Sequence, residues 1–488
     1  MTTYVIRDEH LEPLLRTAPW LPGALRAAQH YTVVDQAALG PGETLLVVAA
    51  HGGRATGERV FVPVRTTASG DLVSGAHGVD APGPEAVRHL LTGRRLRTER
   101  GGHLHFRRAA AAPTGDIEAL PFDQGWSSNS LARVGIGGAP YMYKTYRQLG
   151  AAPHEPEVLR LMSGSGHTPH WAGDCSYTEP SGARRYPWAV LYRHAAGHGI
   201  DRPLRENLRS LWPRLTGHAE PDRLVRAHLR PLAGKLRETG VFLGAFHRDL
   251  AARLGDPATG YPVHDALADV SQRLRTPADF DTQVPHAAQR AALEALRNEL
   301  CLLEREFEGR RTAAGAGPCH GDLHLSHLLC ADEPGGGWRM RVIDLSTPAL
   351  PADGAAYAAQ SPAQDLVAVR RALEYFAADE AAFESARRLG VEATLTMNGS
   401  LDGAPGLPPA RRRVLERVFE TADVWREHVL RLLLGPPHDT PLRRLLYLRR
   451  LLHELAYNHD HARPYHAAID LRHALALARR DPTTPART

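Results

Sequence analysis

The sequence of 488 residues lacks any apolar run of eighteen or more residues. Because a helix needs about 20 predominantly apolar residues to cross a bilayer, we expect no membrane-spanning helix and no membrane partner. The first fifteen residues, MTTYVIRDEHLEPLL, carry early acidic side chains and no apolar signal-peptide core. We therefore expect a cytoplasmic protein.

Cysteine is also scarce, and no two cysteines form a CxxC pair. Free thiols in a reducing compartment therefore fit better than a zinc site or a disulfide framework. The four cysteines are Cys175, Cys301, Cys319 and Cys330.

Lysine occurs only twice, at Lys144 and Lys235, and almost every other cationic side chain is arginine. The 59 basic and 54 acidic residues leave a net charge of only +5, without a basic tail, so the sequence predicts no nucleic-acid partner. Arginine and lysine are not interchangeable at a phosphate site. Each lysine is therefore a candidate for a specific role.

The first two hundred residues predict short helices and strands. Segments 43–51 and 59–67 are rich in β-branched residues and predict strands, and a helix broken by proline precedes them. Segment 130–150 predicts two strands joined by a glycine-rich turn, and 154–164 has helical spacing. Beyond residue 200 most segments show the i, i+3, i+4, i+7 apolar spacing of helices, around a short β insertion near 318–346.

Two acidic motifs in that insertion indicate phosphoryl transfer. Asp322 lies in HGDLHLSHLL (320–329), and Asp344 ends the apolar strand of RVIDLS. Phosphoryl transfer needs a carboxylate at the acceptor, a metal ligand and a cation on the ATP phosphates. Lys144, on the second strand of the glycine-rich hairpin, is the candidate cation, and Glu157 on the following helix is its expected partner. The order hairpin Lys, helix Glu, HGD and IDL predicts a kinase.

A further acidic motif, outside this insertion, offers an alternative catalytic loop. FHRDLAARL (246–254) contains His-Arg-Asp, but Leu254 stands where a protein-kinase loop needs a metal-binding Asn. The segment has helical periodicity, so we predict a core helix there.

Together, HGDLHLSHLL, RVIDLS and SPAQDLVAVRRALEYFA resemble maltokinases and aminoglycoside phosphotransferase-like kinases, including actinobacterial glucosamine kinases. The resemblance extends over nearly the whole chain. It implies an α+β, bilobal eukaryotic-protein-kinase-like fold with ATP between the lobes. The expected domains are an N-terminal cap (1–110), a β-rich N-lobe (111–198) and a helical C-lobe (199–488).

The resemblance also implies roles for individual residues. Asp322 would be the catalytic base, Asp344 a metal ligand and Lys144 the ATP-phosphate lysine. His327 stands where these families usually carry Gln or Asn as the second metal ligand, so Mn²⁺ is an alternative to Mg²⁺. The stretch DLST also departs from the acidic, glycine-containing maltokinase sequence. The remaining expected ATP-site residues are Glu157, Ser128, Asn129 and Ser130.

The C-terminal segment resembles the sugar-binding helices of these kinases and supplies carboxylates, amides and aromatic rings. An acidic pair there would also suit the ammonium of an amino sugar or aminocyclitol. The expected acceptor-binding residues are His324, Trp425, Glu427, His453, Glu454, Tyr457 and Asn458.

These patterns predict an ATP- and Mg²⁺-dependent kinase, acting as a monomer or homodimer, for a hydroxyl of a sugar, amino sugar or cyclitol. An aminoglycoside-inactivating phosphotransferase shares HGD and the strand-end Asp, but it usually lacks an N-terminal cap of this size. The changes at His327 and DLST also suit a pseudokinase-like binding protein that transfers no phosphate.

Overall fold

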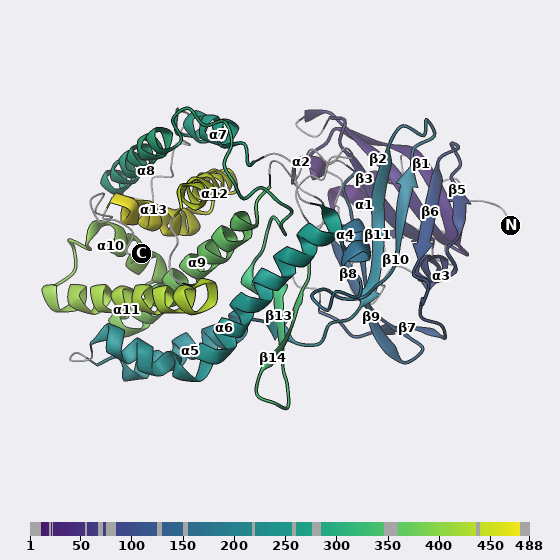
Figure 1. Ribbon diagram of the computed structural model, residues 1–488. Helices are drawn as coiled ribbons and strands as arrows, with labels where there is room; N and C mark the ends of the chain where they lie inside the picture. The colour runs from purple at the N-terminus through teal and green to yellow at the C-terminus, as the bar shows by residue number, and fades with distance from the viewer. Residues whose placement is uncertain are drawn as a thin grey trace. The chain divides into compact units, whose positions relative to one another are not determined.

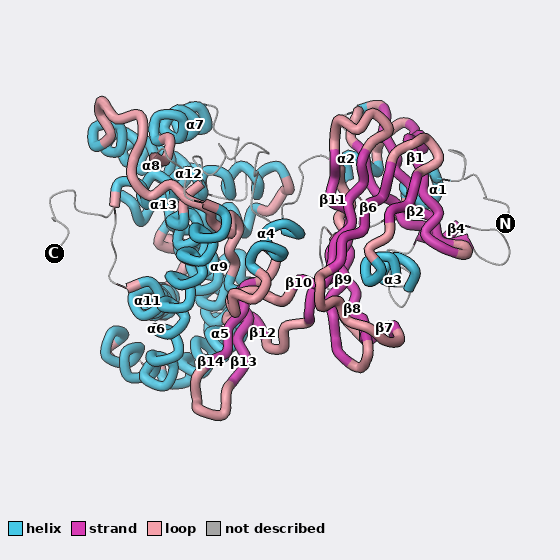
Figure 2. The backbone as a smooth tube through the Cα atoms, turned by 45° about the vertical axis from the view of Figure 1, so that its right-hand side comes forward, coloured by secondary structure: helices cyan, strands magenta, loops and turns pink. Residues whose placement is uncertain are grey.

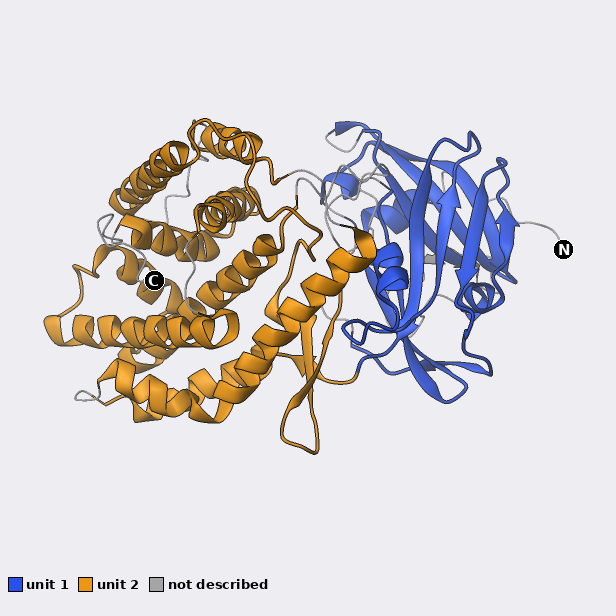
Figure 3. Cartoon of the chain, viewed as in Figure 1, with its two compact units in different colours: residues 1–195, 345–349 blue, residues 196–344, 350–488 orange. Residues whose placement is uncertain are grey.

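A computed structural model describes residues 11–18, 21, 23–53, 56–66, 72–74, 84–123, 129–149, 155–216, 220–255, 260–275, 285–345, 360–435 and 440–478. The chain forms two compact units (Figure 3). Unit 1 contains residues 1–195 and 345–349, and unit 2 contains residues 196–344 and 350–488. Within the described residues no helix is long and apolar enough to span a bilayer.

Unit 1 begins with a four-stranded antiparallel sheet of order β1-β2-β3-β4. The predicted strands at 43–51 and 59–67 are confirmed as β2 and β3. Apolar residues of the short helices α1 (Leu11–Arg16) and α2 (Gly23–Arg26) pack on this sheet. The strands are β1 (His30–Gly40), β2 (Glu43–His51), β3 (Arg59–Thr66) and β4 (Leu72–Ser74).

A seven-stranded antiparallel sheet of order β5-β6-β10-β11-β9-β8-β7 completes unit 1 (Figure 2). Its strands β5 and β6 precede residue 110 and pair with later strands, so that expected domain boundary falls inside unit 1. The elements are α3 (Pro84–Thr92), β5 (Arg95–Arg97), β6 (His103–Arg108), β7 (Ile117–Leu120), β8 (Ser130–Ile136), β9 (Ala139–Thr145), α4 (Glu155–Met162), β10 (Trp171–Thr178) and β11 (Arg185–Arg193).

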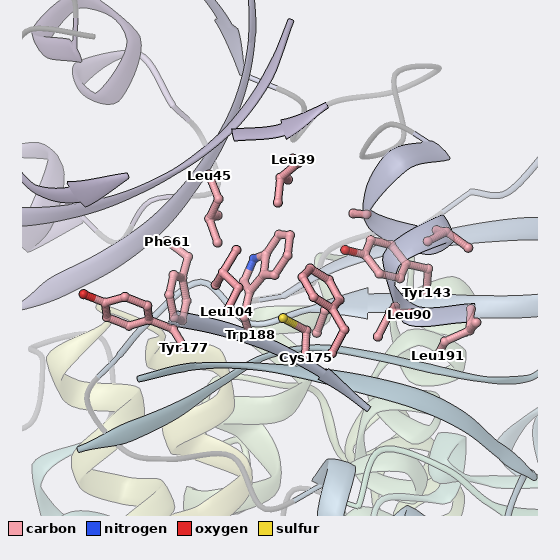
Figure 4. Packing of buried hydrophobic residues seen from close by; sticks show 14 of the residues in the cluster. Leu39, Leu45, Phe61, Leu90, Leu104, Tyr143, Cys175, Tyr177, Trp188 and Leu191 are labelled. Carbon is pink, nitrogen blue, oxygen red and sulfur yellow. The ribbon is translucent and has the colours of Figure 1, made fainter. Parts of the chain in front are cut away.

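One hydrophobic core joins the two sheets of unit 1 (Figure 4). Phe61 from β3 and Trp188 from β11 are fully buried in it, and Tyr143 from β9 is buried in the same core. Successive side chains of a strand point to opposite faces. Because Tyr143 enters the core, its neighbour Lys144 points to the other face of β9.

Unit 2 is mainly helical (Figure 1). The predicted helix at 246–254 is confirmed as the end of the long helix α6, and α12 packs against α7, α9 and α13. The helices are α5 (Asp201–Leu211), η3 (Trp212–Arg214), α6 (Pro221–Leu254), α7 (Val263–Arg275), α8 (His286–Glu306), α9 (Pro362–Leu389), α10 (Ala393–Asp402), α11 (Pro409–Leu434), α12 (Pro441–Asp460) and α13 (Pro464–Ala478).

A small antiparallel sheet, β12-β13-β14, lies next to both the HGD loop and Asp344 in the sequence of unit 2 (Figure 2). The HGD loop leads into the single turn η4 (Leu325–His327) and then into β13 (Leu328–Asp332). β14 (Trp338–Val342) pairs with β13 and ends just before Asp344, and β12 is His198–Gly199. Because Leu328 pairs with Val342, the ends of η4 and β14 lie side by side.

Candidate active site

The backbone of the HGD loop is held by a buried carboxylate. Asp365, in the first turn of α9, is fully buried and accepts the backbone N–H groups of His320 at 2.7 Å and Gly321 at 2.8 Å. The Nε2 atom of His247, on α6, lies 2.8 Å from the same carboxylate. Gly321 has a φ of 84°, which favours glycine. Together these contacts fix the peptide that precedes Asp322.

The two oxygens of the Asp322 carboxylate have different surroundings. Oδ1 accepts hydrogen bonds from Nη1 and Nη2 of Arg450, each at 3.1 Å, and lies 3.2 Å from Nε2 of His324. Oδ2 accepts no hydrogen bond from the described residues. Burial raises the pKa of the Asp322 carboxyl, but His324 and Arg450 outweigh this effect and hold the pKa well below its usual value. The carboxylate is therefore ionised at neutral pH.

His327 and Asp344 face each other at the joined ends of η4 and β14. Nδ1 of His327 lies 3.1 Å from the backbone carbonyl oxygen of Asp322, and Nε2 lies 3.4 Å from Oδ2 of Asp344. Since a carbonyl only accepts, the proton of a neutral imidazole sits on Nδ1 and the Nε2 lone pair faces the carboxylate. Burial, with His320 and His324, lowers the pKa of His327 to about 4 despite Asp344.

This arrangement suits a divalent cation. A lone pair and a carboxylate oxygen that face each other repel, and a cation between two such groups would attract both. An imidazole with its other nitrogen bonded to a carbonyl is the usual form of a histidine ligand. The described residues contain no cluster of three or more His, Cys, Asp or Glu side chains suited to a metal. Magnesium in kinases needs only one or two carboxylates, because ATP phosphates and water supply the other ligands.

Asp344 has an unusual backbone conformation for a residue with a side chain. Its φ is 58°, in the left-handed region, and only Ala404 and Ala462 share this sign among described non-glycine residues. Aspartate tolerates this region better than most residues, but the conformation still costs free energy. Strained backbone of this kind clusters at functional sites, which agrees with a ligand role for Asp344.

In unit 1, Lys144 forms a buried ion pair, but with a different partner from the one we expected. Its Nζ atom lies 2.6 Å from Oε2 of Glu155, the first residue of α4, which also accepts from the hydroxyl of Tyr146 at 2.8 Å. The expected pairing with Glu157 is wrong. Glu157 lies two positions further along α4, where its half-exposed carboxylate pairs instead with Arg107 and Arg160.

The glycine-rich turn before Lys144 is a tight two-residue hairpin. Gly137 and Gly138 have φ values of 55° and 78°, as in a type I′ turn. A Cβ atom on Gly137 would lie 2.4 Å from the carbonyl oxygen of Thr114. The hairpin itself therefore requires glycine here.

The other expected ATP-site residues lie just before or at the start of β8. Ser130 pairs with Thr145, and Leu131 pairs with Lys144, so Ser130 lies at the strand end next to the lysine. Asn129 immediately precedes it, and Ser128 lies outside the described residues.

Of the expected acceptor-binding residues, His324 contacts Asp322 directly, and Glu454 is connected to Asp322 through Arg450. Its Oε1 accepts from Nε of Arg450 at 2.6 Å, and its Oε2 accepts from Nε of Arg371 at 2.8 Å. Arg371 is almost fully buried and also bonds Glu374 and Asp470. Both oxygens of Glu454 are thus engaged by arginines, and the carboxylate connects Arg450 to a buried network.

Asn458 belongs to the same network, since its Nδ2 donates to Tyr375 and Asp470. The side chain of Asn458 is only 5% exposed, so its burial does not support the expectation that it binds the acceptor. His453 and Tyr457 lie on the exposed side of α12, and the Tyr457 ring stacks on His461 with centroids 3.9 Å apart.

Trp425 is not accessible to an acceptor. Its side chain is fully buried between helices, next to Phe376, and its indole N–H donates to Oδ1 of Asn207 at 2.9 Å. The expectation that Trp425 contacts an acceptor is wrong, because the apolar spacing of α11 (Pro409–Leu434) directs the ring into the core. Glu427, two residues on, is exposed and pairs with Arg426.

Sequence reasoning missed three residues that surround the HGD loop: Arg450, Asp365 and His247. Asp365 stands in the SPAQDL stretch, whose Ser-Pro start is a helix N-terminus signal, and an acid at that position could have been singled out. Arg450 and His247 carry no such local signal.

Comparison with solved structures supports the fold. A glucosamine kinase in complex with glucosamine, ADP and inorganic phosphate matches with a TM-score of 0.53 and 18% identity, over 96% of this chain and 98% of that chain. Another crystal form of glucosamine kinase matches with a TM-score of 0.54 and 18% identity, over 96% and 99%.

This chain has the fold of glucosamine kinase. The expected kinase-like α+β fold with an N-terminal cap is therefore confirmed. No family model matches the sequence, and no curated protein does.

Proposed function

We propose that this chain is an ATP-dependent kinase that transfers the γ-phosphate of ATP to a hydroxyl group of a sugar, an amino sugar or a cyclitol. The observation that carries the proposal is the asymmetry of Asp322. Two N–H groups of Arg450 donate to Oδ1 and Nε2 of His324 lies 3.2 Å from it, whereas Oδ2 accepts from none of the described residues. A fixed carboxylate with one such oxygen is suited to accept a hydrogen bond from an acceptor hydroxyl.

The low pKa of Asp322 fits this reaction. In phosphoryl transfer through a loose transition state, the acceptor hydroxyl must be oriented, and it loses its proton late. A weakly basic carboxylate that is always ionised can orient the hydroxyl and take up the proton as the new bond forms. The anchored loop, held by Asp365, keeps the carboxylate in place.

The other proposed roles follow the same template. Lys144, held by Glu155, neutralises the ATP phosphates. Asp344 and His327 would hold the divalent cation, Mg²⁺ or Mn²⁺, which would supply positive charge to offset that of the phosphates. The glucosamine kinase of the same fold was solved with ADP and a sugar amine, which supports this class of co-substrates.

The test is ATP consumption by the full chain with maltose, glucose, glucosamine and cyclitols, each with Mg²⁺ and with Mn²⁺. On an active acceptor, Asp322→Asn should lower kcat by at least about 10²-fold, because a positioned acid–base group typically contributes that much. ATP affinity should be unchanged. The matched control is Asp332→Asn, an exposed carboxylate at the end of β13 that pairs with Lys235.

Two results would contradict the proposal. Undiminished turnover in Asp322→Asn would remove Asp322 from the chemistry. Absence of metal-dependent transfer to every acceptor, with nucleotide still bound, would favour the alternative of a non-catalytic binding protein.

A further inference from the structure

The carboxylates in the arginine network around Asp322 are already bound to arginine. Glu454 contacts Arg450 and Arg371, and Asp322 itself contacts Arg450. Asp269 on α7 is bonded by Arg273 and by Arg449, the neighbour of Arg450 on α12. A site for an ammonium group would need a carboxylate with uncommitted oxygens. Both oxygens of Glu454 and both oxygens of Asp269 are therefore committed to arginines.

The group bonded to Oδ1 of Asp322 is a cation. Arg450 reaches Asp322 with both terminal nitrogens, and its side chain keeps about a quarter of its surface exposed. Its guanidinium is fixed from behind, because its Nε donates to Glu454, which Arg371 holds in turn. Arg371 is rigidly placed, since its 1% exposed side chain also bonds Glu374 and Asp470.

We propose that Arg450 is a positioning and specificity-determining residue that favours acceptors without a positive charge beside the reacting hydroxyl. This inference rests on the proposed function and narrows it to neutral sugars and polyols. An amino group next to the phosphorylated hydroxyl would meet the fixed guanidinium at a few ångströms, where like charges repel. A neutral hydroxyl at the same place can accept a hydrogen bond from the arginine, which has donors only.

Arg450 also fixes the rotamer of Asp322. By engaging only Oδ1 it leaves Oδ2 to the acceptor, so its removal should affect the reaction with every acceptor as well as the choice between them. Positioning and charge selection are separable, because lysine keeps the charge but cannot make the same two-nitrogen contact.

The experiment compares glucose with glucosamine, and a neutral cyclitol with its amino derivative, as acceptors for the full chain. Wild type should show kcat/KM at least about tenfold higher for the neutral member of each pair. Arg450→Gln should lower kcat on the neutral acceptor and bring the neutral-to-amine ratio close to one. Arg450→Lys should lower kcat similarly but keep the ratio high.

The matched control is Arg449→Gln. Arg449 precedes Arg450 on α12 but bonds Asp269 and Tyr261, so its loss removes one charge from the same helix without touching Asp322. The ratio of kcat/KM for the neutral acceptor to kcat/KM for the amino acceptor should be the same in Arg449→Gln as in wild type. Thermal unfolding of each variant identifies any loss of folded protein, and Arg450→Lys, which preserves the charge of the network, gives an answer even where Arg450→Gln folds poorly.

The outcomes are distinct. Equal or higher kcat/KM with the amino acceptor in wild type, or an unchanged ratio in a folded Arg450→Gln, overturns the role of Arg450 while the kinase assignment stands. Lack of turnover with both members of every pair overturns the proposed function, and the inference falls with it.

Discussion

The ammonium nitrogen of Lys144 lies 2.6 Å from Oε2 of Glu155, and the two side chains are only 4% and 1% exposed. A buried charge without its partner is costly, so removal of one member typically destabilises a protein by about 3–5 kcal/mol. Such a pair between a strand lysine and a helix glutamate is also a requirement of active protein kinases. We therefore expect both stability and activity to depend on this contact.

Variants can separate the two effects. Lys144→Met should lower the free energy of unfolding by about 3 kcal/mol, because Glu155 stays buried without its cation. The double variant Lys144→Met, Glu155→Gln should regain most of that loss, since the amide oxygen can still accept from Tyr146. ATP turnover should stay abolished in both. Urea unfolding and steady-state kinetics measure these quantities.

Glu157→Gln is the matched control, because Glu157 lies on the same helix and is half exposed. It should leave both turnover and stability near wild type. Recovery of turnover in the double variant would show that Lys144 has no role with ATP beyond folding.

The anchor of the HGD loop gives a second prediction. Asp365→Asn replaces a carboxylate that accepts two backbone N–H groups by an amide with one accepting oxygen. We expect kcat to fall by at least about tenfold, since small displacements of a catalytic group are costly. The KM for ATP should stay near wild type, because the hydrogen bonds of Asp365 go to His247 and to the backbone of the HGD loop, not to Lys144 or Asp344.

Ser361→Ala provides a control for the lost stability of α9. Ser361 caps that helix through Ala363, and loss of such a cap typically costs about 1 kcal/mol. If this variant lowers kcat as much as Asp365→Asn does, general destabilisation of α9 would explain the effect, and the specific anchor role would be wrong.

These contacts show what the sequence could predict and what it could not. HGD, IDL and the lysine hairpin stand in local motifs, so Asp322, Asp344 and Lys144 could be singled out in advance. The partner of Lys144 could not, because Glu155 and Glu157 are two residues apart on one short helix. Helix rotation alone decides which of the two is buried.

The same limit explains Arg450 and Trp425. Arg450 is 128 residues from Asp322 in the sequence and lies among several similar arginines in α12, so no local pattern distinguishes it. Trp425 was misplaced because an aromatic residue near charged ones suits both a sugar site and a core. The strands and helices were easier to predict, since apolar periodicity reports burial directly.

The buried network behind Arg450 predicts an unusual pH dependence of stability. Burial raises the pKa of Asp470 to about 7, although Arg371 opposes it. Burial lowers the pKa of the nearby His473 to about 3. Asp470 therefore takes up its proton more readily when folded, which favours the folded state as pH falls through 7. His473 takes up its proton more readily when unfolded, which favours unfolding as pH falls below about 6.5.

Between about pH 6.5 and 4 the two contributions have opposite slopes and offset each other. Asp470→Asn removes only the contribution of the Asp470 carboxyl to the pH dependence of stability. Its stability should therefore fall by about 2 kcal/mol more than that of wild type between pH 7 and pH 5. Urea unfolding at the two pH values measures the difference, and Glu304→Gln, at an exposed position of α8, is the control. Parallel loss in wild type and Asp470→Asn would contradict the raised pKa of Asp470.

The last prediction concerns the metal. Mg²⁺ prefers oxygen ligands, whereas Mn²⁺ also accepts imidazole nitrogen, so His327 should favour Mn²⁺ relative to an oxygen ligand at the same place. His327→Asn places an amide oxygen near Asp344 and should shift the ratio of Mn²⁺ to Mg²⁺ affinity toward Mg²⁺ by about tenfold. Titration of Mn²⁺ and Mg²⁺ in the presence of a non-hydrolysable ATP analogue measures both affinities without turnover.

Asp344→Asn is the companion variant, because asparagine tolerates the positive φ of this position and only the charge is lost. It should weaken both metals alike, since a carboxylate is a ligand for each, whereas His327→Asn should change their order. If His327→Asn leaves the ratio unchanged while Asp344→Asn weakens both, the imidazole does not bind the cation. His327 would then only support the backbone of Asp322 through its Nδ1 contact.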